Sequence, residues 1–211
     1  MTTQLGSSFS TEEMNHSLER DFSRVYGDHV PMGGLAGFAW GGLRAFSELF
    51  EAMTTNGDAL ILYGPHVNVN SDGIVGSDLA SNSAKKALQY VKEVSSGARK
   101  EMTMDDVMDE SGMLCMDMEQ YFVNNALLPY AERLNKAEDI ATELPYTLFE
   151  AQDTMMQELV VEGCEKEEIR GFVAMLGGIQ ISTPKGVSDY FLPLRFELRD
   201  GDGQLVKDLM W

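Results

Sequence analysis

The sequence predicts a single α/β domain in which a central, mostly parallel sheet is flanked by helices. Residues 59–62 form an unbroken apolar run, which indicates a strand covered on both faces. Amphipathic helical patterns lie on either side of this run, and two apolar, β-branched and aromatic segments near the C-terminus predict two further strands. We find no internal repeat and no low-complexity linker, so we expect residues 1–211 to form one domain.

The first predicted helix begins at Ser10. Ser10 as N-cap, with Glu13 three residues later, makes a capping box, and apolar residues follow at helical spacing as far as Gly27. A glycine-rich segment at residues 33–42 comes next. It lacks the GxGxxG spacing of a dinucleotide site and no clear strand precedes it, so we expect a pocket wall or tight packing beneath the sheet. Residues 43–53 then predict a second helix.

The strand at residues 59–62 ends in a Gly-Pro break that leaves His66 just beyond it. In open α/β sheets, ligands bind outside the carboxyl ends of such strands, so His66 stands where a site is expected. Residues 70–73, Asn-Ser-Asp-Gly, predict a turn.

Helical patterns dominate the middle of the chain. Residues 84–94 predict a helix with lysines facing water, and residues 102–162 predict helices that Pro129 and Pro145 start, stop or kink. We expect the methionines of this region to fill the core rather than bind a soft metal. They are Met113, Met116 and Met118.

The two C-terminal strands are joined by the polar segment TPKGVS. Pro193 lies within the second of these strands. Proline has no backbone N–H, so it cannot donate the hydrogen bond that a central strand of a sheet requires. We therefore expect that strand to lie at an edge of the sheet or to contain a bulge.

Net charge, hydropathy and cysteine count indicate which classes of partner and which cellular compartment to expect. A formal net charge of −18 disfavours binding to nucleic acid or to an anionic membrane, and no apolar run approaches the roughly 20 residues that span a bilayer. The two cysteines, Cys115 and Cys164, are too few for a disulfide framework and form no CxxC pair. Residues 1–15 lack a secretory or transit pattern. We expect a cytoplasmic protein, or one in an organelle stroma if a targeting segment was removed before Met1.

Four long segments of the chain, in order and over nearly its whole length, carry a family resemblance. They read NHSLERDFSRVYGDHVPMGGLAGFAWGG, LILYGPHVNVNSDGIVG, LLPYAERLNKAED and GGIQISTPKGVSDYFLPLRFELRDGDG. In these segments the chain resembles the limiting-CO2-inducible protein B/C family, the theta-type carbonic anhydrases. The resemblance implies a fold like that of the β-carbonic anhydrases, a homodimer, CO2 and bicarbonate as substrates, and zinc held by two cysteines and one histidine.

Carried over residue by residue, the resemblance makes His66 the histidine ligand. Ser10 stands at the first cysteine, because STEEMN occupies the place of the family's Cys-x-Asp-Glu-x-Asn. Glu12 replaces the aspartate of that segment and is the candidate catalytic, proton-handling residue; it also suits the first turn of a helix, where the dipole favours a carboxylate. The second cysteine falls at residues 88–90, where Leu88 begins an apolar and amide stretch, and residues 77–83 lack the family's arginine.

These replacements bear directly on the chemistry. Hydration of CO2 needs a metal-bound water with a pKa of about 7, which requires roughly three protein ligands and an open position. A serine hydroxyl is a poor zinc ligand at neutral pH, and a leucine cannot bind metal. We therefore expect no zinc, and a degenerate member that keeps the scaffold as a partner, assembly or sensing module. The alternative is an active carbonic anhydrase that uses His66 in a non-standard metal shell.

Each of the three histidines can also have a structural role without binding a metal. His66 also fits a strand-end histidine bonded to the backbone. His16 and His29 have no motif around them, and we expect both to be surface or loop residues.

Overall fold

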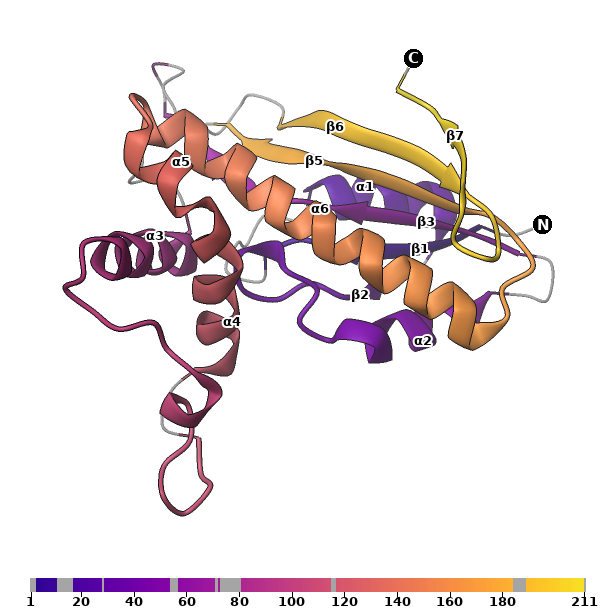
Figure 1. Ribbon diagram of the computed structural model, residues 1–211. Helices are drawn as coiled ribbons and strands as arrows, with labels where there is room; N and C mark the ends of the chain where they lie inside the picture. The colour runs from indigo at the N-terminus through magenta and orange to yellow at the C-terminus, as the bar shows by residue number, and fades with distance from the viewer. Residues whose placement is uncertain are drawn as a thin grey trace.

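A mixed seven-stranded sheet forms the centre of the molecule. The computed structural model describes residues 3–10, 17–27, 29–53, 57–70, 72, 81–114, 117–183 and 189–210. The strand order is β2-β1-β3-β5-β6-β7, and β4 pairs with β5 beside this path. Helices pack on both faces of the sheet (Figure 1). The α/β fold expected from the sequence is confirmed.

Most of the strands are parallel. They are β1 (Thr3–Ser8), β2 (His29–Pro31), β3 (Asp58–Tyr63), β4 (His66–Asn68) and β5 (Val173–Ser182). The last two strands are antiparallel, and these are β6 (Tyr190–Arg199) and β7 (Leu205–Asp208). Parallel strands bring their carboxyl ends to one edge of a sheet, so that edge is where a site can be assembled.

Four strands were not predicted from the sequence. β1 carries glycine and serines in place of an apolar run, β2 and β4 have 3 residues each, and β7 is exposed along its length. The expectation that no strand precedes the glycine-rich segment is wrong, since β2 ends at Pro31 directly before it. The expected bulge near Pro193 is present, because the β5–β6 register shifts between Gly177 and Gly178, opposite Pro193.

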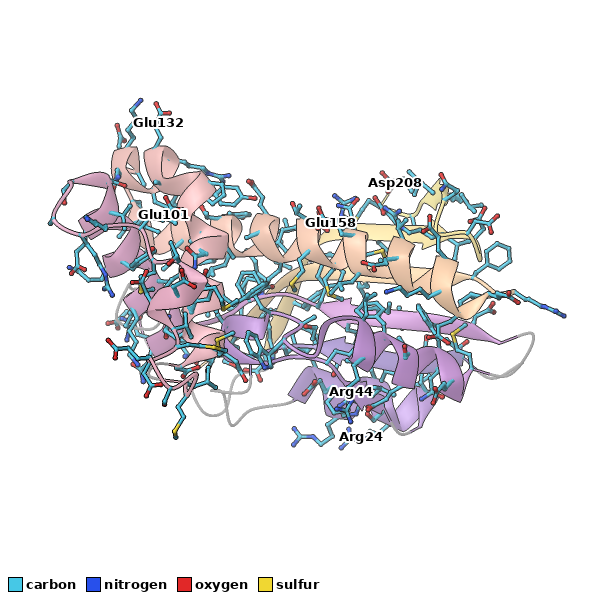
Figure 2. All side chains as sticks on the ribbon, turned by 60° about the horizontal axis from the view of Figure 1, so that its bottom comes forward. Arg24, Arg44, Glu101, Glu132, Glu158 and Asp208 are labelled. Atoms are coloured by element: carbon cyan, nitrogen blue, oxygen red, sulfur yellow. The ribbon has the colours of Figure 1, made fainter. Side chains whose placement is uncertain are left out.

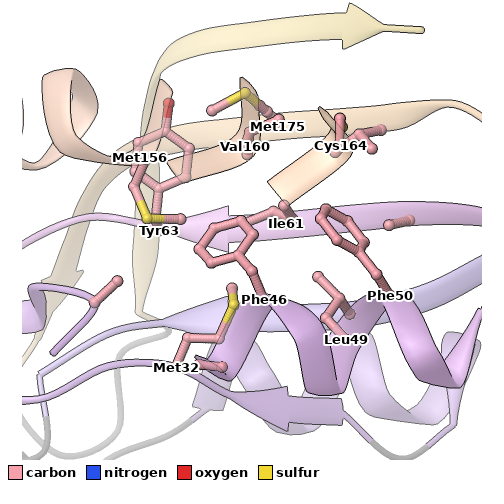
Figure 3. Close-up of a cluster of buried hydrophobic side chains, with 14 of the residues drawn as sticks. Met32, Phe46, Leu49, Phe50, Ile61, Tyr63, Met156, Val160, Cys164 and Met175 are labelled. Atoms are coloured by element: carbon pink, nitrogen blue, oxygen red, sulfur yellow. The ribbon is translucent and has the colours of Figure 1, made fainter. Parts of the chain in front are cut away.

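One face of the sheet is covered by α2 (Gly42–Ala52) and by the second half of α6 (Ile140–Glu167). Phe46, Leu49 and Phe50 of α2 meet strand and α6 side chains in one buried cluster (Figure 3). Gly163 of α6 permits this approach, because a Cβ there would lie 2.7 Å from a ring carbon of Phe50. Helix α1 (Ser17–Tyr26) covers the other face through Leu18 and Phe22.

A helical lobe extends from the sheet on the side toward which β3 points (Figure 1). It contains α3 (Asn82–Ser95), α4 (Met118–Leu127) and α5 (Ala131–Lys136), which share a second buried cluster with the first half of α6. Side-chain oxygens of Ser81, Asp117 and Asp139 cap α3, α4 and α6. Pro129 lies in the short helical turn that links α4 to α5, and Pro145 lies inside α6.

Between α3 and α4 the chain forms a projecting arm instead of the helix expected there. The arm comprises residues 103–114, and Figure 1 shows it running beyond α4, away from the sheet. The expectation of a core role for Met113 is wrong, because this side chain is 68% exposed. Met116 and Cys115 lie outside the described residues, and Met118 is half-buried.

Charged side chains are spread over the whole surface (Figure 2). Glu158 of α6 and Arg44 of α2 belong to helices that cover one face of the sheet, and Arg24 belongs to α1, which covers the other face. Arg24 pairs with Asp21 at 2.9 Å, and such exposed pairs contribute little to stability. Among the described helices, none is long and apolar enough to cross a membrane.

We predict that the α2 cluster carries a large share of the folding free energy. Phe46 is fully buried, so Phe46→Ala should lower the free energy of unfolding by about 3–5 kcal/mol through lost burial and an unfilled cavity. The matched control is Phe172→Ala, at a ring 45% exposed, which should cost no more than about 1 kcal/mol. Urea unfolding followed by circular dichroism measures both values, and equal losses would contradict the assignment of the core.

Candidate functional site

The carboxyl ends of β1, β3 and β5 meet at one edge of the sheet. Ser8 pairs with Tyr63 at the last position of the β1–β3 ladder, and Tyr63 pairs with Gly177 of β5. Ser10 follows β1, and His66 follows β3. Ser182 closes β5 and lies at the end of its ladder with β4. Three side chains from distant parts of the sequence are thus delivered to this edge.

His66 reaches the edge because the chain steps sideways after β3. Gly64 has φ 150°, and a Cβ on it would lie 1.6 Å from the carbonyl oxygen of Gly178, so only glycine fits. After this step β4 pairs with β5 from His66 opposite Gln180. The Gly-Pro break at residues 64–65 therefore moves the chain from β3 to β4, and both strands pair with β5.

The imidazole of His66 is buried and held by a hydroxyl. Its exposed fraction is 5%, and Nε2 lies 2.7 Å from Ser182 Oγ. This bond fixes the plane of the ring. A ring nitrogen that shares a hydrogen bond cannot bind a metal at the same time, so a metal on Nε2 would have to displace Ser182. This partner of the ring is the side chain of Ser182.

The glycine-rich segment crosses this edge in close contact with the strand ends. Gly37, with φ 86°, accepts a hydrogen bond from the Ser8 hydroxyl at 2.9 Å. A Cβ on Gly37 would lie 2.7 Å from the oxygen of Gly64 and 3.3 Å from the amide nitrogen of Ser10. Ser10 and the step before His66 therefore flank the same glycine, which agrees with the tight packing expected for this segment.

Gln152 is a polar residue of the site that sequence reasoning missed. It is fully buried in α6, and its Nε2 donates to the carbonyl of Ala36 in the glycine-rich segment. Its Oε1 has no hydrogen-bond partner among the described residues. A buried amide oxygen in that condition can accept a hydrogen bond from a small ligand or water. A glutamine within a long helix gave no signal of this role.

A buried charge network underlies the end of β3. The hydroxyl of Tyr63 donates to Asp153 of α6 at 2.5 Å, and Arg195 of β6 binds both oxygens of that carboxylate. Arg195 also pairs with Glu197. Burial, followed by the charge of Asp153, raises the pKa of Tyr63 far above its ordinary value. Because Arg195 is bound to two carboxylates, it does not supply the cation that residues 77–83 lack.

A second polar cluster lies between α1 and the β1–β2 edge. It opens into a cavity of about 340 Å3, and Glu19 accepts a hydrogen bond from Ser7 there. His29 Nε2 is 3.7 Å from Glu19, and Ser23 Oγ is 3.2 Å from His29 Nδ1. The expectation of a surface or loop residue is wrong for His29, which starts β2 and is partly buried.

The remaining predicted residues divide into two groups. Ser10 is buried, with an exposed fraction of 2%, and Leu88 lies in the buried cluster of the helical lobe. Glu12, His16 and the Ser10–Glu13 capping box lie wholly or partly outside the described residues, as do residues 77–80 of the segment without an arginine.

Cys164 lies away from the edge, in the core beneath the sheet. It belongs to the cluster of α2 and α6 side chains, and burial raises the pKa of its thiol to about 11. A thiol in this place packs as a small apolar group and takes no part in the site around His66.

Comparisons with known proteins agree with this fold. The family of limiting CO2-inducible proteins B/C beta carbonic anhydrases matches residues 2–200. The crystal structure of PtLCIB4, a homolog of the limiting CO2-inducible protein LCIB, is similar with a TM-score of 0.83 and 34% identity, over 99% of this chain and 86% of that chain. LCIB itself matches in fold, with a TM-score of 0.66 and 14% identity over 98% of this chain and 83% of that chain. No curated protein matches.

Together, the sheet and these matches define a carbonic-anhydrase-like α/β protein. The chain belongs to the limiting CO2-inducible protein B/C family.

The described donors at the edge do not fit the zinc of that family. Zinc with an open position is held by about three imidazole, thiolate or carboxylate ligands. Besides His66, the described polar side chains here include the hydroxyls of Ser8, Ser10 and Ser182 and the amide of Gln152. Within the described ranges, no three His, Cys, Asp or Glu residues are grouped so that they could hold a metal ion.

We predict that Asp153 is essential for stability. Asp153→Asn should lower the free energy of unfolding by about 3–5 kcal/mol, because it leaves Arg195 and the Tyr63 hydroxyl without their charged acceptor. Glu158→Gln, at an exposed position of the same helix, is the matched control and should change it by about 0.5 kcal/mol or less. Thermal and urea unfolding of the two variants measure the difference, and similar values would count against a structural role for the network.

We also predict that Cys164 is unreactive in the folded protein. With a pKa of about 11, the thiol is roughly one part in a thousand thiolate at pH 8, and only the thiolate attacks a disulfide reagent. In a Cys115→Ser background, labelling by an aromatic disulfide should be slow in buffer and fast in denaturant, and should speed up as the pH rises toward the thiol pKa. Rapid labelling of the folded chain at pH 8 would be the contrary result.

Proposed function

We propose that this chain is a degenerate theta-type carbonic anhydrase, which keeps the scaffold of CO2 and bicarbonate interconversion without its zinc centre. The observation that carries the proposal is the 2.7 Å hydrogen bond between His66 Nε2 and Ser182. In this proposal the buried imidazole of His66 is hydrogen-bonded to a hydroxyl instead of being bound to zinc. The edge then contains packed, hydrogen-bonded polar side chains and no metal.

Two further observations support the loss of the metal. Ser10, at the place of the first cysteine, is buried beside the strand ends, where a neutral hydroxyl replaces a thiolate. Leu88, in the region of the second cysteine, is part of an apolar cluster. A neutral oxygen and a hydrocarbon cannot balance the charge of a divalent ion as two thiolates do.

The role that remains for such a scaffold is non-catalytic. We propose a homodimer of single-domain chains, with residues 1–211 forming each domain, that acts as a partner, assembly or sensing module in the cytoplasm or an organelle stroma. The low cysteine count supports a reducing compartment. The net charge of −18 supports partners other than nucleic acid or an anionic membrane.

The second candidate is an active carbonic anhydrase with His66 in a non-standard metal shell and Glu12 as the proton-handling group. It is favoured by the position of His66, which is buried and fixed at the carboxyl edge. The amide oxygen of Gln152 could then orient a substrate at the same edge.

We predict that the purified chain holds far less than one zinc per molecule after incubation with zinc and dialysis, and that it hydrates CO2 no faster than buffer. Elemental analysis and stopped-flow CO2 hydration measure the two quantities. About one zinc per chain, removed by a chelator together with the activity, would reject the proposal and select the second candidate.

A restored ligand tests the assignment of Ser10 itself. Ser10→Cys adds a thiolate at the proposed ligand position, so this variant should bind cobalt(II) more tightly than the native chain and show a thiolate charge-transfer band. Ser10→Ala is the matched control and should bind no better than the native chain. Equal cobalt binding by both variants would mean that residue 10 does not face the former metal position.

A further inference from the structure

The arm of residues 103–114 is the least explained part of the surface. It leaves the end of α3, runs past α4 and returns, and Figure 1 shows its tip well outside the packed body. The arm runs away from the sheet and from the edge around His66, so neither of them accounts for its exposed side chains.

The arm is unusually apolar for an exposed segment. Met104, Met108, Met113 and Leu114 are 50%, 44%, 68% and 59% exposed. Soluble monomers rarely gather several large apolar side chains on one projection, and such patches mark interaction surfaces. Methionine suits this use, because its flexible thioether adapts to the partner's shape.

The arm is also built to keep its shape. Met108 and Leu114 form an antiparallel bridge, and Asp109 accepts hydrogen bonds from the amides of Ser111 and Met113. Gly112, with φ 78°, makes the turn. At the base, Thr103 and Asp106 form a capping box. An ordered arm loses less conformational entropy when it docks, which favours binding.

Charge separates the arm from the helix that precedes it. The arm carries four carboxylates and no cation, and these are Asp105, Asp106, Asp109 and Glu110. Residues 82–100 carry five cations and a single carboxylate, although the whole chain has a net charge of −18. The cations are Lys85, Lys86, Lys92, Arg99 and Lys100. The two surfaces are complementary in charge.

The basic surface borders a groove between α3 and α4, which we call the α3–α4 groove. Its volume is about 450 Å3, in the range of clefts that bury a small ligand. One wall is lined by Lys85, Lys86, Gln89, Tyr90, Glu93 and Arg99. The Arg99 guanidinium lies 5.1 Å from the centre of the Tyr90 ring and pairs with Glu93 at 3.5 Å. Gln120 and Asn124 of α4 line the other wall. The groove thus offers two lysines at its rim, and an Arg99–Glu93 pair, an aromatic ring and amides within.

We propose that the arm of one copy of this chain docks in the α3–α4 groove of a second copy, whose own arm docks in return. Methionine and leucine side chains of the arm enter the groove, and its carboxylates face the lysines at the rim. This inference names the surfaces of the homodimer proposed above and rests on that part of the proposed function.

A second copy fits better than another polyanion. Nucleic acid would meet the basic helix but also the repulsion of the strongly negative remainder of the chain. The arm and the groove adjoin in one lobe, so a two-fold axis between two such lobes satisfies both contacts at once, as a closed dimer requires. The apolar side chains supply affinity, and the charges fix the register.

Complementary charge reversal tests the contact. The arm variant is Asp105→Lys/Glu110→Lys, at two exposed residues, and the groove variant is Lys85→Glu/Lys86→Glu, at the two lysines that line the groove. Each variant alone should have a dimer dissociation constant raised about tenfold or more, because the reversed side chains now face side chains of their own sign across the contact. An equimolar mixture should recover association, since one contact of the mixed dimer is native and the other again has opposite charges at the substituted positions. Sedimentation velocity over a concentration series measures this.

A control on α6 separates a specific arm–groove contact from a general effect of charge. Glu158→Lys/Glu165→Lys makes the same charge change as the arm variant at exposed sites of α6 and should leave the dimer unchanged, while circular dichroism checks that every variant is folded. A dimer that neither variant weakens, or a mixture that stays monomeric, would overturn the arm contact and leave the homodimer standing. A native chain that is monomeric at about 1 mM would overturn both.

Discussion

The structure depends on a close backbone approach at the carboxyl edge of the sheet. The carbonyl of Gly178 occupies the space where a side chain on Gly64 would lie, and Gly37 packs in turn against the carbonyl of Gly64. Three separate segments can meet there only because each contributes a residue without a Cβ. The step at Gly64 moves the chain from the β3 ladder to β4, which decides that His66 points into the interior. The position of the site is therefore set by which backbone segments can approach closely, and its chemistry then depends on the side chains that those segments carry.

Beneath that edge, a network of charges holds the layers together. Asp153 of α6 binds Tyr63 of β3 and Arg195 of β6, so a helix and two strands are joined through one carboxylate. Such groups are costly to bury, and they are retained only when each has its partner. This network also explains why an arginine close to the site takes no part in it: both of its carboxylate partners are structural.

Membership of the limiting CO2-inducible protein B/C family does not settle what the edge does. A fold fixes where a site can lie, and the side chains placed there decide the chemistry. Here His66 lies buried at the edge, and the described groups around it at the strand ends include hydroxyls and an amide. Such a set favours a packed, hydrogen-bonded interior over a charged metal shell.

The sequence by itself determined the parts whose signal is local. The buried run of β3, the amphipathic patterns of α2 and α3 and the pair β5–β6 could all be predicted, because periodicity reflects which face of an element is buried. His66 could be singled out, since it follows a strand directly. Strands β1, β2, β4 and β7 could not be predicted, because their serines, short length or exposure leave no periodic pattern. Only the tertiary structure decided that Ser182 and Gln152 reach the same edge and that the methionines of the arm face outward. Those outcomes depend on contacts between residues far apart in the chain, and no short window of sequence contains them.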